Sequence, residues 1–309
     1  MYPRSSAYGT LGGVRKIHVI GIGAGDPDQL TLQAVKALRA TDVFFILDKG
    51  AEKSDLTALR RSILDAHLSD PSAYRVVEAR DPDRDRRAGG SAYSPAVGDW
   101  RSRRADIYER LILDELGEDE TGAFLVWGDP ALYDSTLGIL REVLDRGSVC
   151  FDHDVVPGVS SVSALVARHR TGLNRVAGPV QITTGRRLSE GFPEGVDDVV
   201  VMLDAHQAFT RYAGGGSGGD TESDGHIDPA APGETTGSGT ATDTAADLDM
   251  DIYWGAYIGT PDEILISGPL SEVSQEIVDV RARARERKGW IMDTYLLRRH
   301  RGGADGSGA

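Results

Sequence analysis

The sequence predicts a two-domain α/β protein, with a mostly parallel, doubly wound sheet first and a mixed α+β domain second. Short apolar, β-branched runs alternate with helical patterns through the first half of the chain, as in parallel sheets with crossover helices. In the second half, strand patterns follow one another without a helix between them, which favours antiparallel pairs. The 309 residues, 40% of them hydrophobic, suffice for two cores.

The first half divides into five strands separated by helices. Residues 16–22 form the first strand pattern, and in residues 30–40 the side chains of Leu30, Ala34, Ala37 and Leu38 share one helical face. The apolar run 42–47 predicts the second strand. Further helices are expected over 55–68, 99–116 and 135–145, and further strands over 74–79, 123–127 and 149–156.

Pro157 and Gly158 interrupt this alternation, so we expect domains over 14–156 and 157–300 that enclose a cleft. The second domain is expected to begin with a helix over 160–169. Its strand patterns cover 180–184, 198–203, 252–258, 263–267 and 290–297, and a charged helix covers 271–288.

Several segments have too few apolar residues to offset the entropy of ordering. Residues 213–250 consist mainly of Gly, Ser, Thr, Asp and Ala, and are expected to form a disordered acidic insertion. Flexible termini are expected over 1–13 and 302–309, and a loop over 81–99.

Charge and cysteine content exclude several classes of protein. The net charge of −14 disfavours nonspecific binding to nucleic acid or anionic membranes, although nine of the acids lie within 213–251. The single cysteine, Cys150, cannot form an internal disulfide, and no Cys/His cluster indicates a metal site. No signal-like segment and no run of ~18 apolar residues is present. These features predict a soluble, cytoplasmic protein.

Three motifs follow strand patterns at the end where open α/β sheets bind ligands. The first, GIGAGD (21–26), lets the backbone approach a ligand closely. With Asp48 as a ribose acid it could also be a dinucleotide fingerprint, but Asp26 and Asp28 would repel a pyrophosphate at a helix N-terminus. The second, WGDPALY (127–133), and the third, VPGVSS (156–161), read individually as a turn and a helix N-cap.

In this order and spacing, GIGAGD with GDPDQLT (25–31), the GDP turn and the PGVSS segment resemble the tetrapyrrole (corrin/porphyrin) methylase family. The resemblance runs from about residue 14 to 299. It implies a two-domain methylase fold, S-adenosylmethionine in the cleft between the domains, and a homodimer. Ala24 stands where many relatives have Pro, which leaves a cofactor contact from that side chain in doubt, and the acidic insertion is not part of the family pattern.

Seven segments narrow the resemblance within the family. They resemble the member that methylates C1 of the polycarboxylated tetrapyrrole precorrin-5, with release of acetate, in cobalamin biosynthesis. The segments are VIGIGAGDPDQLTLQAVKAL, DVFFILDKG, YRVVEARDP, FLVWGDPALYDST, QITTGRRLSEGFP, DIYWGAYIGTPDEILI and KGWIMDTYLLRR.

The resemblance carries over to individual positions. Those that match the family's cofactor contacts are Trp127, Gly128, Asp129, Leu132, Ser160, Ser161, Met202 and Gly259. A core position on a strand is the competing interpretation for Met202.

Methyl transfer from a sulfonium needs alignment and exclusion of water, and no protein nucleophile. Acetate release would benefit from a positioned base and an oxyanion donor, for which the candidates are Asp48, Lys49, Asp129, Tyr133 and His206. Asp48 is preferred, although it could cap a helix, and His206 could be an ordinary solvated histidine. Because the substrate carries carboxylates, we expect cations near it, from Arg80, Arg84, Arg186 and Arg187, each of which could also be a surface charge.

Other kinds of protein are compatible with parts of this pattern. Another precorrin methylase or a diphthine-type methylase would share the family pattern. Outside the family, a nicotinamide-dependent oxidoreductase and a noncatalytic interaction protein that docks through its acidic insertion are the other classes.

Overall fold

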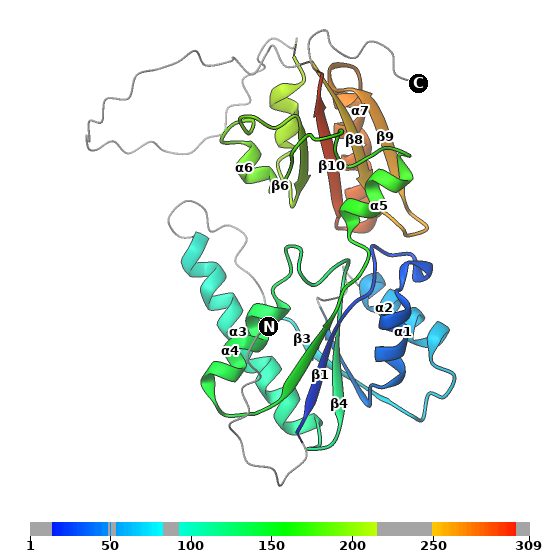
Figure 1. Cartoon of the computed structure of the whole chain (residues 1–309), viewed down its shortest axis with the longest axis vertical. Coiled ribbons are helices and arrows are strands. Elements are labelled where there is room, and N and C mark those ends of the chain that lie inside the picture. The colour runs from blue at the N-terminus through cyan, green and yellow to red at the C-terminus, as the bar shows by residue number, and fades with distance from the viewer. Residues whose placement is uncertain (1–13, 49, 51–53, 83–92, 215–248, 301–309) are drawn as a thin grey trace, which may run out of the picture. The chain divides into compact units, whose positions relative to one another are not determined.

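The computed structural model describes residues 14–48, 50, 54–82, 93–214 and 249–300 (Figure 1). The chain divides into two compact units. Unit 1 comprises residues 1–164, 257–263 and 285–291, and unit 2 comprises 165–256, 264–284 and 292–309. Two segments from late in the chain thus belong to unit 1. Most of the expected insertion and both expected flexible termini lie outside the described residues.

Unit 1 contains a sheet of five parallel strands, as predicted, in the order β3-β2-β4-β1-β5 (Figure 1). The strands are β1 (Lys16–Gly21), β2 (Val43–Asp48), β3 (Arg75–Arg80), β4 (Thr121–Val126) and β5 (Asp152–Val156). Central strands β1 and β4 are almost entirely buried, which explains their continuous apolar runs.

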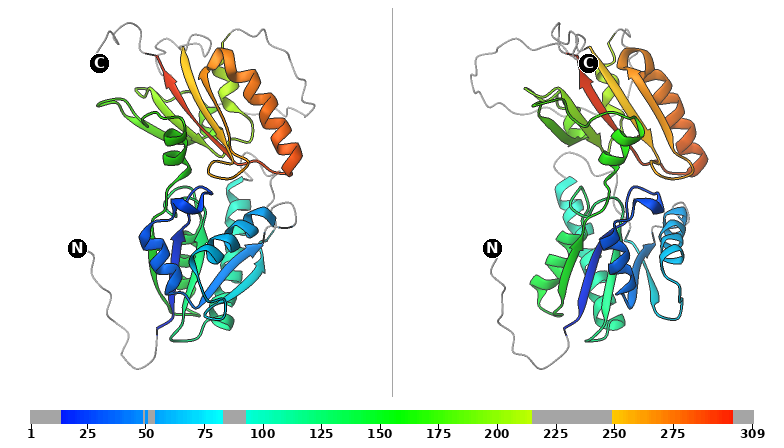
Figure 2. Two further views of the ribbon diagram at one scale, coloured as in Figure 1. Left: turned by 90° about the vertical axis from the view of Figure 1, so that its right-hand side faces the viewer. Right: turned by 45° about the vertical axis from the view of Figure 1, so that its right-hand side comes forward.

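Helices cover both faces of this sheet (Figures 1 and 2). The pair α1 (Leu32–Arg39) and α2 (Ser54–His67) packs on one face, and the pair α3 (Tyr93–Glu115) and α4 (Thr136–Arg146) on the other. Neighbouring strand residues alternate between these layers, so that Phe44 packs against the first pair and Phe45 against the second. The chain leaves adjacent strands β1 and β4 toward opposite faces, which makes their carboxyl ends a topological switch point.

Helix α3 begins at Tyr93, so the predicted loop over 81–99 is wrong from that residue on. Pro95 lies in the first turn of the helix, where a missing N–H costs no hydrogen bond. These additional turns carry α3 past the carboxyl ends of the strands (Figure 1).

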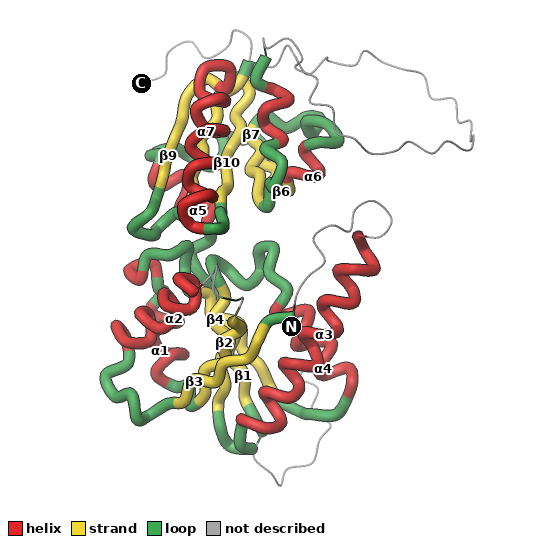
Figure 3. The backbone as a smooth tube through the Cα atoms, turned by 180° about the vertical axis from the view of Figure 1, so that it is seen from behind, coloured by secondary structure: helices red, strands yellow, loops and turns green. Residues whose placement is uncertain are grey.

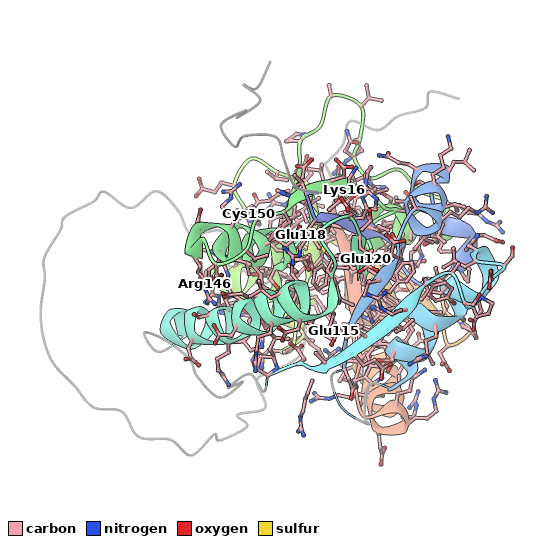
Figure 4. The ribbon with its side chains drawn as sticks, turned by 90° about the horizontal axis from the view of Figure 1, so that it is seen from below. Lys16, Glu115, Glu118, Glu120, Arg146 and Cys150 are labelled. Atoms are coloured by element: carbon pink, nitrogen blue, oxygen red, sulfur yellow. The ribbon has the colours of Figure 1, made fainter. Side chains whose placement is uncertain are left out.

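The amino-terminal edge of the sheet carries ion pairs. Figure 4 looks onto this edge, where Lys16, Glu115, Glu118 and Glu120 are labelled. The guanidinium of Arg75 donates to both carboxylate oxygens of Glu120, at 2.9 and 3.0 Å, and the Gly117 N–H donates at 2.8 Å. These hydrogen bonds, with Arg75 contributing most, lower the pKa of Glu120 to about 2.

This pairing predicts an acid-dependent loss of stability. The lowered pKa of Glu120 stabilises the fold above pH ~4.5, and the contribution disappears as the pH falls toward about 2. Solvent screening limits the effect to roughly 0.5–1 kcal/mol. Thermal melts of the wild type and Glu120→Gln should therefore differ at pH 6 and converge only as the pH falls through about 2. A constant difference across this range would contradict the assignment.

Unit 2 contains a mixed five-stranded sheet in the order β6-β7-β10-β8-β9. Its strands are β6 (Val180–Thr184), β7 (Asp198–Met202), β8 (Met250–Ala256), β9 (Ile264–Pro269) and β10 (Asp293–Arg299). Only β6 and β7 pair in parallel within the described sheet, so the predicted antiparallel pairs are confirmed.

Helix α7 (Leu270–Lys288) packs against one face of this sheet (Figure 3), while α5 (Ser161–Arg168) leads into unit 2. The sequence did not predict α6 (Gly185–Leu188) or the 3-10 helix over Ala208–Tyr212, because such short helices show no periodicity. Across the described ranges, no helix is long and apolar enough to span a bilayer.

Candidate functional site

Three glycines bring the loops of unit 1 into direct backbone contact at the carboxyl edge of the sheet. A Cβ atom on Gly158 would lie 2.1 Å from the Gly128 carbonyl oxygen, and one on Gly21 would lie 2.6 Å from the Gly158 nitrogen. Neither distance is sterically allowed. Each of the three predicted motifs therefore contributes one glycine to a contact made of backbone alone, which no larger residue would allow.

Further contacts fix the first loop. The Gly128 N–H donates to the Gly23 carbonyl at 2.8 Å, which joins the GIGAGD and WGDP segments. Gly259 has a φ of +78°, and a Cβ there would lie 2.9 Å from the Asp26 nitrogen. The Gly259 N–H donates to the Glu263 carboxylate at 2.7 Å. Segment 257–263 thus packs on the first loop although it lies more than 230 residues later in the chain.

The carboxylate of Asp129 is used within the backbone framework. One oxygen accepts from the Gly158 N–H at 3.0 Å and the other from the Ala131 N–H at 2.8 Å. The side chain therefore ties the GDP turn to the third motif, a positioning role.

The third motif ends in a helix cap. The hydroxyl oxygen of Ser160 accepts from the Ser163 N–H at 3.2 Å, so the predicted N-cap is confirmed. Ser161 is the first residue of α5 and is half-buried.

The WGDPALY turn presents two aromatic side chains. The Trp127 Nε1 is buried and, among the described residues, has no hydrogen-bond partner, which is a costly state for a donor. Leu132 is half-buried, whereas Tyr133 is 47% exposed and has a positive φ of 51°. A left-handed backbone at tyrosine is strained, and such strain concentrates at functional sites.

Two further candidates lie at the ends of β2 and β3. One carboxylate oxygen of Asp48 accepts from the Gly50 N–H at 3.0 Å, and the other has no hydrogen bond within the described residues. The side chain thus caps a turn and not a helix. Arg80 is exposed and lines a cavity of about 420 Å³ beside α3. Lys49 and Arg84 lie outside the described residues.

The remaining candidates belong to unit 2. Met202 is the half-buried last residue of β7. Arg186 and Arg187 are exposed on α6, and the pairing of Arg187 with Glu190 at 2.7 Å raises the pKa of its guanidinium. His206 is exposed in the turn after β7.

A buried network holds that turn, and sequence reasoning missed it. The carboxylate of Asp204 accepts from the backbone N–H groups of His206 and Ala208 at 3.1 and 2.7 Å, and from the Tyr295 hydroxyl at 2.6 Å. Burial and the charge of Asp204 raise the pKa of Tyr295 well above its ordinary value, so this hydroxyl stays protonated and donates. The network fixes a turn that contains a strained, positive φ of 54° at Leu203.

Arg281 of α7 completes the network. Its guanidinium donates to the carbonyl oxygen of Asp204 at 3.0 Å and pairs with the carboxylate of Asp293 at 2.8 Å. Asp293 also accepts from the indole N–H of Trp254 at 3.1 Å. Burial raises the pKa of Asp293 even though Arg281 opposes that shift.

Comparisons with known proteins fit this arrangement. A sequence profile of tetrapyrrole (corrin/porphyrin) methylases matches residues 16–274. The chain is also 47% identical over 293 residues to precorrin-6A synthase [deacetylating] of Sinorhizobium sp, with 95% of this chain and 97% of that protein covered. The chain belongs to the tetrapyrrole methylase family.

Other members resemble parts or all of the chain. Precorrin-2 C(20)-methyltransferase of Sinorhizobium sp is 29% identical over 152 residues, with 49% of this chain and 56% of that protein covered. The crystal structure of a cobalamin-synthesis-related protein from Corynebacterium diphtheriae is 33% identical, covers 92% of this chain and 98% of its own, and has a TM-score of 0.69. The two-unit fold is thus that of this methylase family.

Two further residues that sequence reasoning missed support the site. The side chain of Gln29 accepts from the Ala24 N–H at 3.0 Å. Arg60 on α2 donates to the Leu125 carbonyl at 3.3 Å, just beyond the three residue pairs over which β2 and β4 are bonded. Burial lowers the pKa of Arg60. The role of Gln29 could have been found in the sequence, since a long polar side chain follows the glycine loop by four residues. Nothing in the sequence around Arg60 indicates its role.

The first loop of this family also differs in structure from a dinucleotide-binding fingerprint. In that fingerprint a helix starts within the glycine motif and points its N-terminus at the pyrophosphate. Here α1 starts at Leu32, and Asp26 caps a short 3-10 helix over Pro27–Gln29 by accepting from the Asp28 N–H. The carboxylates therefore make the electrostatic potential at this loop negative, which disfavours binding of a pyrophosphate.

Proposed function

We propose that the chain is an S-adenosylmethionine-dependent methyltransferase that methylates C1 of precorrin-5 and releases acetate, giving precorrin-6A. The 47% identity to precorrin-6A synthase [deacetylating] over 95% of the chain carries this proposal. That length of similarity includes all three glycine loops and the Asp204 turn, and not the first loop alone. Cobalamin biosynthesis is the corresponding pathway.

The residues at the carboxyl edge fit S-adenosylmethionine. The contact among Gly21, Gly128 and Gly158 fixes the three loops at the carboxyl edge, and the buried Trp127 Nε1 lacks an acceptor that a polar ligand can supply. We propose that the cofactor is held by Trp127, Gly128, Asp129, Leu132, Ser160, Ser161, Met202 and Gly259, with Asp129 acting through the backbone it holds. When bound, S-adenosylmethionine supplies an electrophilic methyl group.

The chain's own residues then align the acceptor carbon and exclude water. For acetate release we propose Asp48 as the base, because one of its carboxylate oxygens has no hydrogen bond within the described residues. Tyr133 is a proposed oxyanion donor, since its side chain is 47% exposed and is carried on a strained turn. His206 is the alternative base. Arg80, Arg84, Arg186 and Arg187 are proposed to attract the substrate's carboxylates.

Mass spectrometry of purified protein with S-adenosylmethionine and enzymatically generated precorrin-5 tests this function. We expect methylated tetrapyrrole and acetate in equal amounts. Asp48→Asn should slow acetate release by about 100-fold relative to methylation, with His206→Gln as the matched comparison. Cofactor binding without turnover would overturn the substrate but leave the family, and methylation without acetate would point to another precorrin methylase.

We also propose a cytoplasmic homodimer, on the family resemblance alone. Light scattering should give a mass of twice 33.1 kDa for the purified chain. A mass of 33.1 kDa at micromolar concentration would contradict the dimer.

A further inference from the structure

The N-terminal part of α3 extends beyond the carboxyl edge of the unit 1 sheet (Figures 1 and 3). Arg104 marks the level of that edge. Its guanidinium pairs with Asp81, the first residue after β3, at 2.8 Å, and donates to the Ser135 hydroxyl, directly before α4, at 3.0 Å. Residues of α3 that precede Arg104 therefore lie on the ligand-binding side of the sheet.

Arg101 lies one turn before Arg104, about 4.5 Å further along the helix axis. Its side chain is half-buried, and its Nε is fully buried without a hydrogen-bond partner. Within the described ranges, Arg101 has no acidic partner either. Its neighbours on α3 differ, because Arg103 pairs with Asp99 at 2.9 Å and Arg104 pairs with Asp81.

Helix α4 has a glycine at the position that faces the Arg101 side chain. Gly138 lies in the third position of α4, and a Cβ there would lie 2.6 Å from a terminal nitrogen of Arg101. Glycine in a helix is intrinsically unfavourable, so a packing reason is expected for it. Here the missing side chain gives the guanidinium its place against the helix. The cation is thus seated between two helices, and does not extend freely into solvent.

We propose that Arg101 binds a carboxylate of the tetrapyrrole substrate. This inference rests on the proposed function and adds a residue that the sequence did not single out. A half-buried guanidinium without an acidic partner among the described residues suits a carboxylate, which a guanidinium can bind through two parallel hydrogen bonds. Of the previously expected cations, Arg187 already pairs with Glu190. No acidic side chain among the described residues neutralises Arg101. This cation therefore stands out in a chain whose full sequence has a net charge of −14.

The kinetic test compares Arg101→Met with Arg103→Met, which removes a paired and exposed charge two residues away. We expect Arg101→Met to raise the KM for precorrin-5 about 10- to 100-fold, the usual effect of losing a hydrogen bond to a charged group. The KM for S-adenosylmethionine should stay within about twofold. Arg103→Met should leave both values unchanged. Arg101→Gln serves as a second variant in case the methionine variant does not fold.

A binding measurement separates this inference from the proposed function. Uroporphyrin I, a porphyrin with acetate and propionate side chains, is titrated against each folded variant while tryptophan fluorescence is followed. Weaker binding by Arg101→Met than by Arg103→Met supports the carboxylate site even if precorrin-5 is not turned over. Equal uroporphyrin affinity and an unchanged KM would overturn the site even if precorrin-5 is methylated normally.

Discussion

Gly158→Ala should abolish detectable methylation and lower the free energy of unfolding by about 2–4 kcal/mol. The new Cβ would lie 2.1 Å from the Gly128 carbonyl oxygen and 2.8 Å from the Gly21 carbonyl carbon. Both are backbone atoms in neighbouring loops, so no side chain can rotate away. The loops must separate, and the arrangement of the three loops proposed to hold the cofactor would be lost.

Urea unfolding and isothermal titration with S-adenosylmethionine measure the two effects. Gly98→Ala is the matched control, because this glycine lies inside α3 and a Cβ there would have no atom within 4 Å. That control should gain about 0.5–1 kcal/mol through helix propensity and keep its cofactor affinity. Normal cofactor affinity in folded Gly158→Ala would show that the three-glycine contact does not shape the site.

Arg281→Met should cost about 3–5 kcal/mol of unfolding free energy, because it leaves a buried carboxylate without its cation. The side chains of Arg281 and Asp293 are only 7% and 6% exposed. The Asp204 carbonyl would also lose a donor, so the turn that follows Met202 and carries His206 should loosen. Unit 2 is therefore expected to lose both stability and the order of its part of the candidate site.

The loss of unfolding free energy in Arg281→Met should depend on pH in a characteristic way. Burial already raises the pKa of Asp293, and removal of Arg281 raises it further. Asp293 then takes up a proton more readily in the folded state than in the unfolded state. The loss of unfolding free energy relative to the wild type should therefore be largest at neutral pH and shrink as the pH falls through the raised pKa. The double variant Arg281→Met/Asp293→Asn should recover part of the loss at pH 7. If the effects of the two substitutions on the free energy of unfolding were fully additive, Arg281 and Asp293 would not be a coupled pair.

The sequence predicted the parallel sheet of unit 1 well, because each buried strand is a continuous apolar run and each helix has one apolar face. It also led to the three glycine motifs, whose meaning depends on their order along the chain. It could not predict the early start of α3 at Tyr93, since a first turn that contains Ser94 and Pro95 resembles a loop. Helix α6 is likewise too short for any periodic signal.

Buried polar partners were the other feature that the sequence concealed. Asp204 is separated from Tyr295 by 91 positions, and Arg281 lies 77 positions from Asp204. No local spacing relates these residues, and each alone looks like an ordinary surface side chain. Arg101 was missed for the same reason, because its setting depends on the absence of a side chain at Gly138 on another helix.

The late segments of unit 1 limit how this protein can be divided or recombined. The chain passes from one unit to the other after residues 164, 256, 263, 284 and 291. A fragment that ends at residue 164 would lack Gly259 and the rest of the segment that packs on the first loop. A chimera that exchanges unit 1 with that of a related methylase must therefore transfer three separate pieces of sequence. The units are structural modules, but a single cut in the gene cannot separate them.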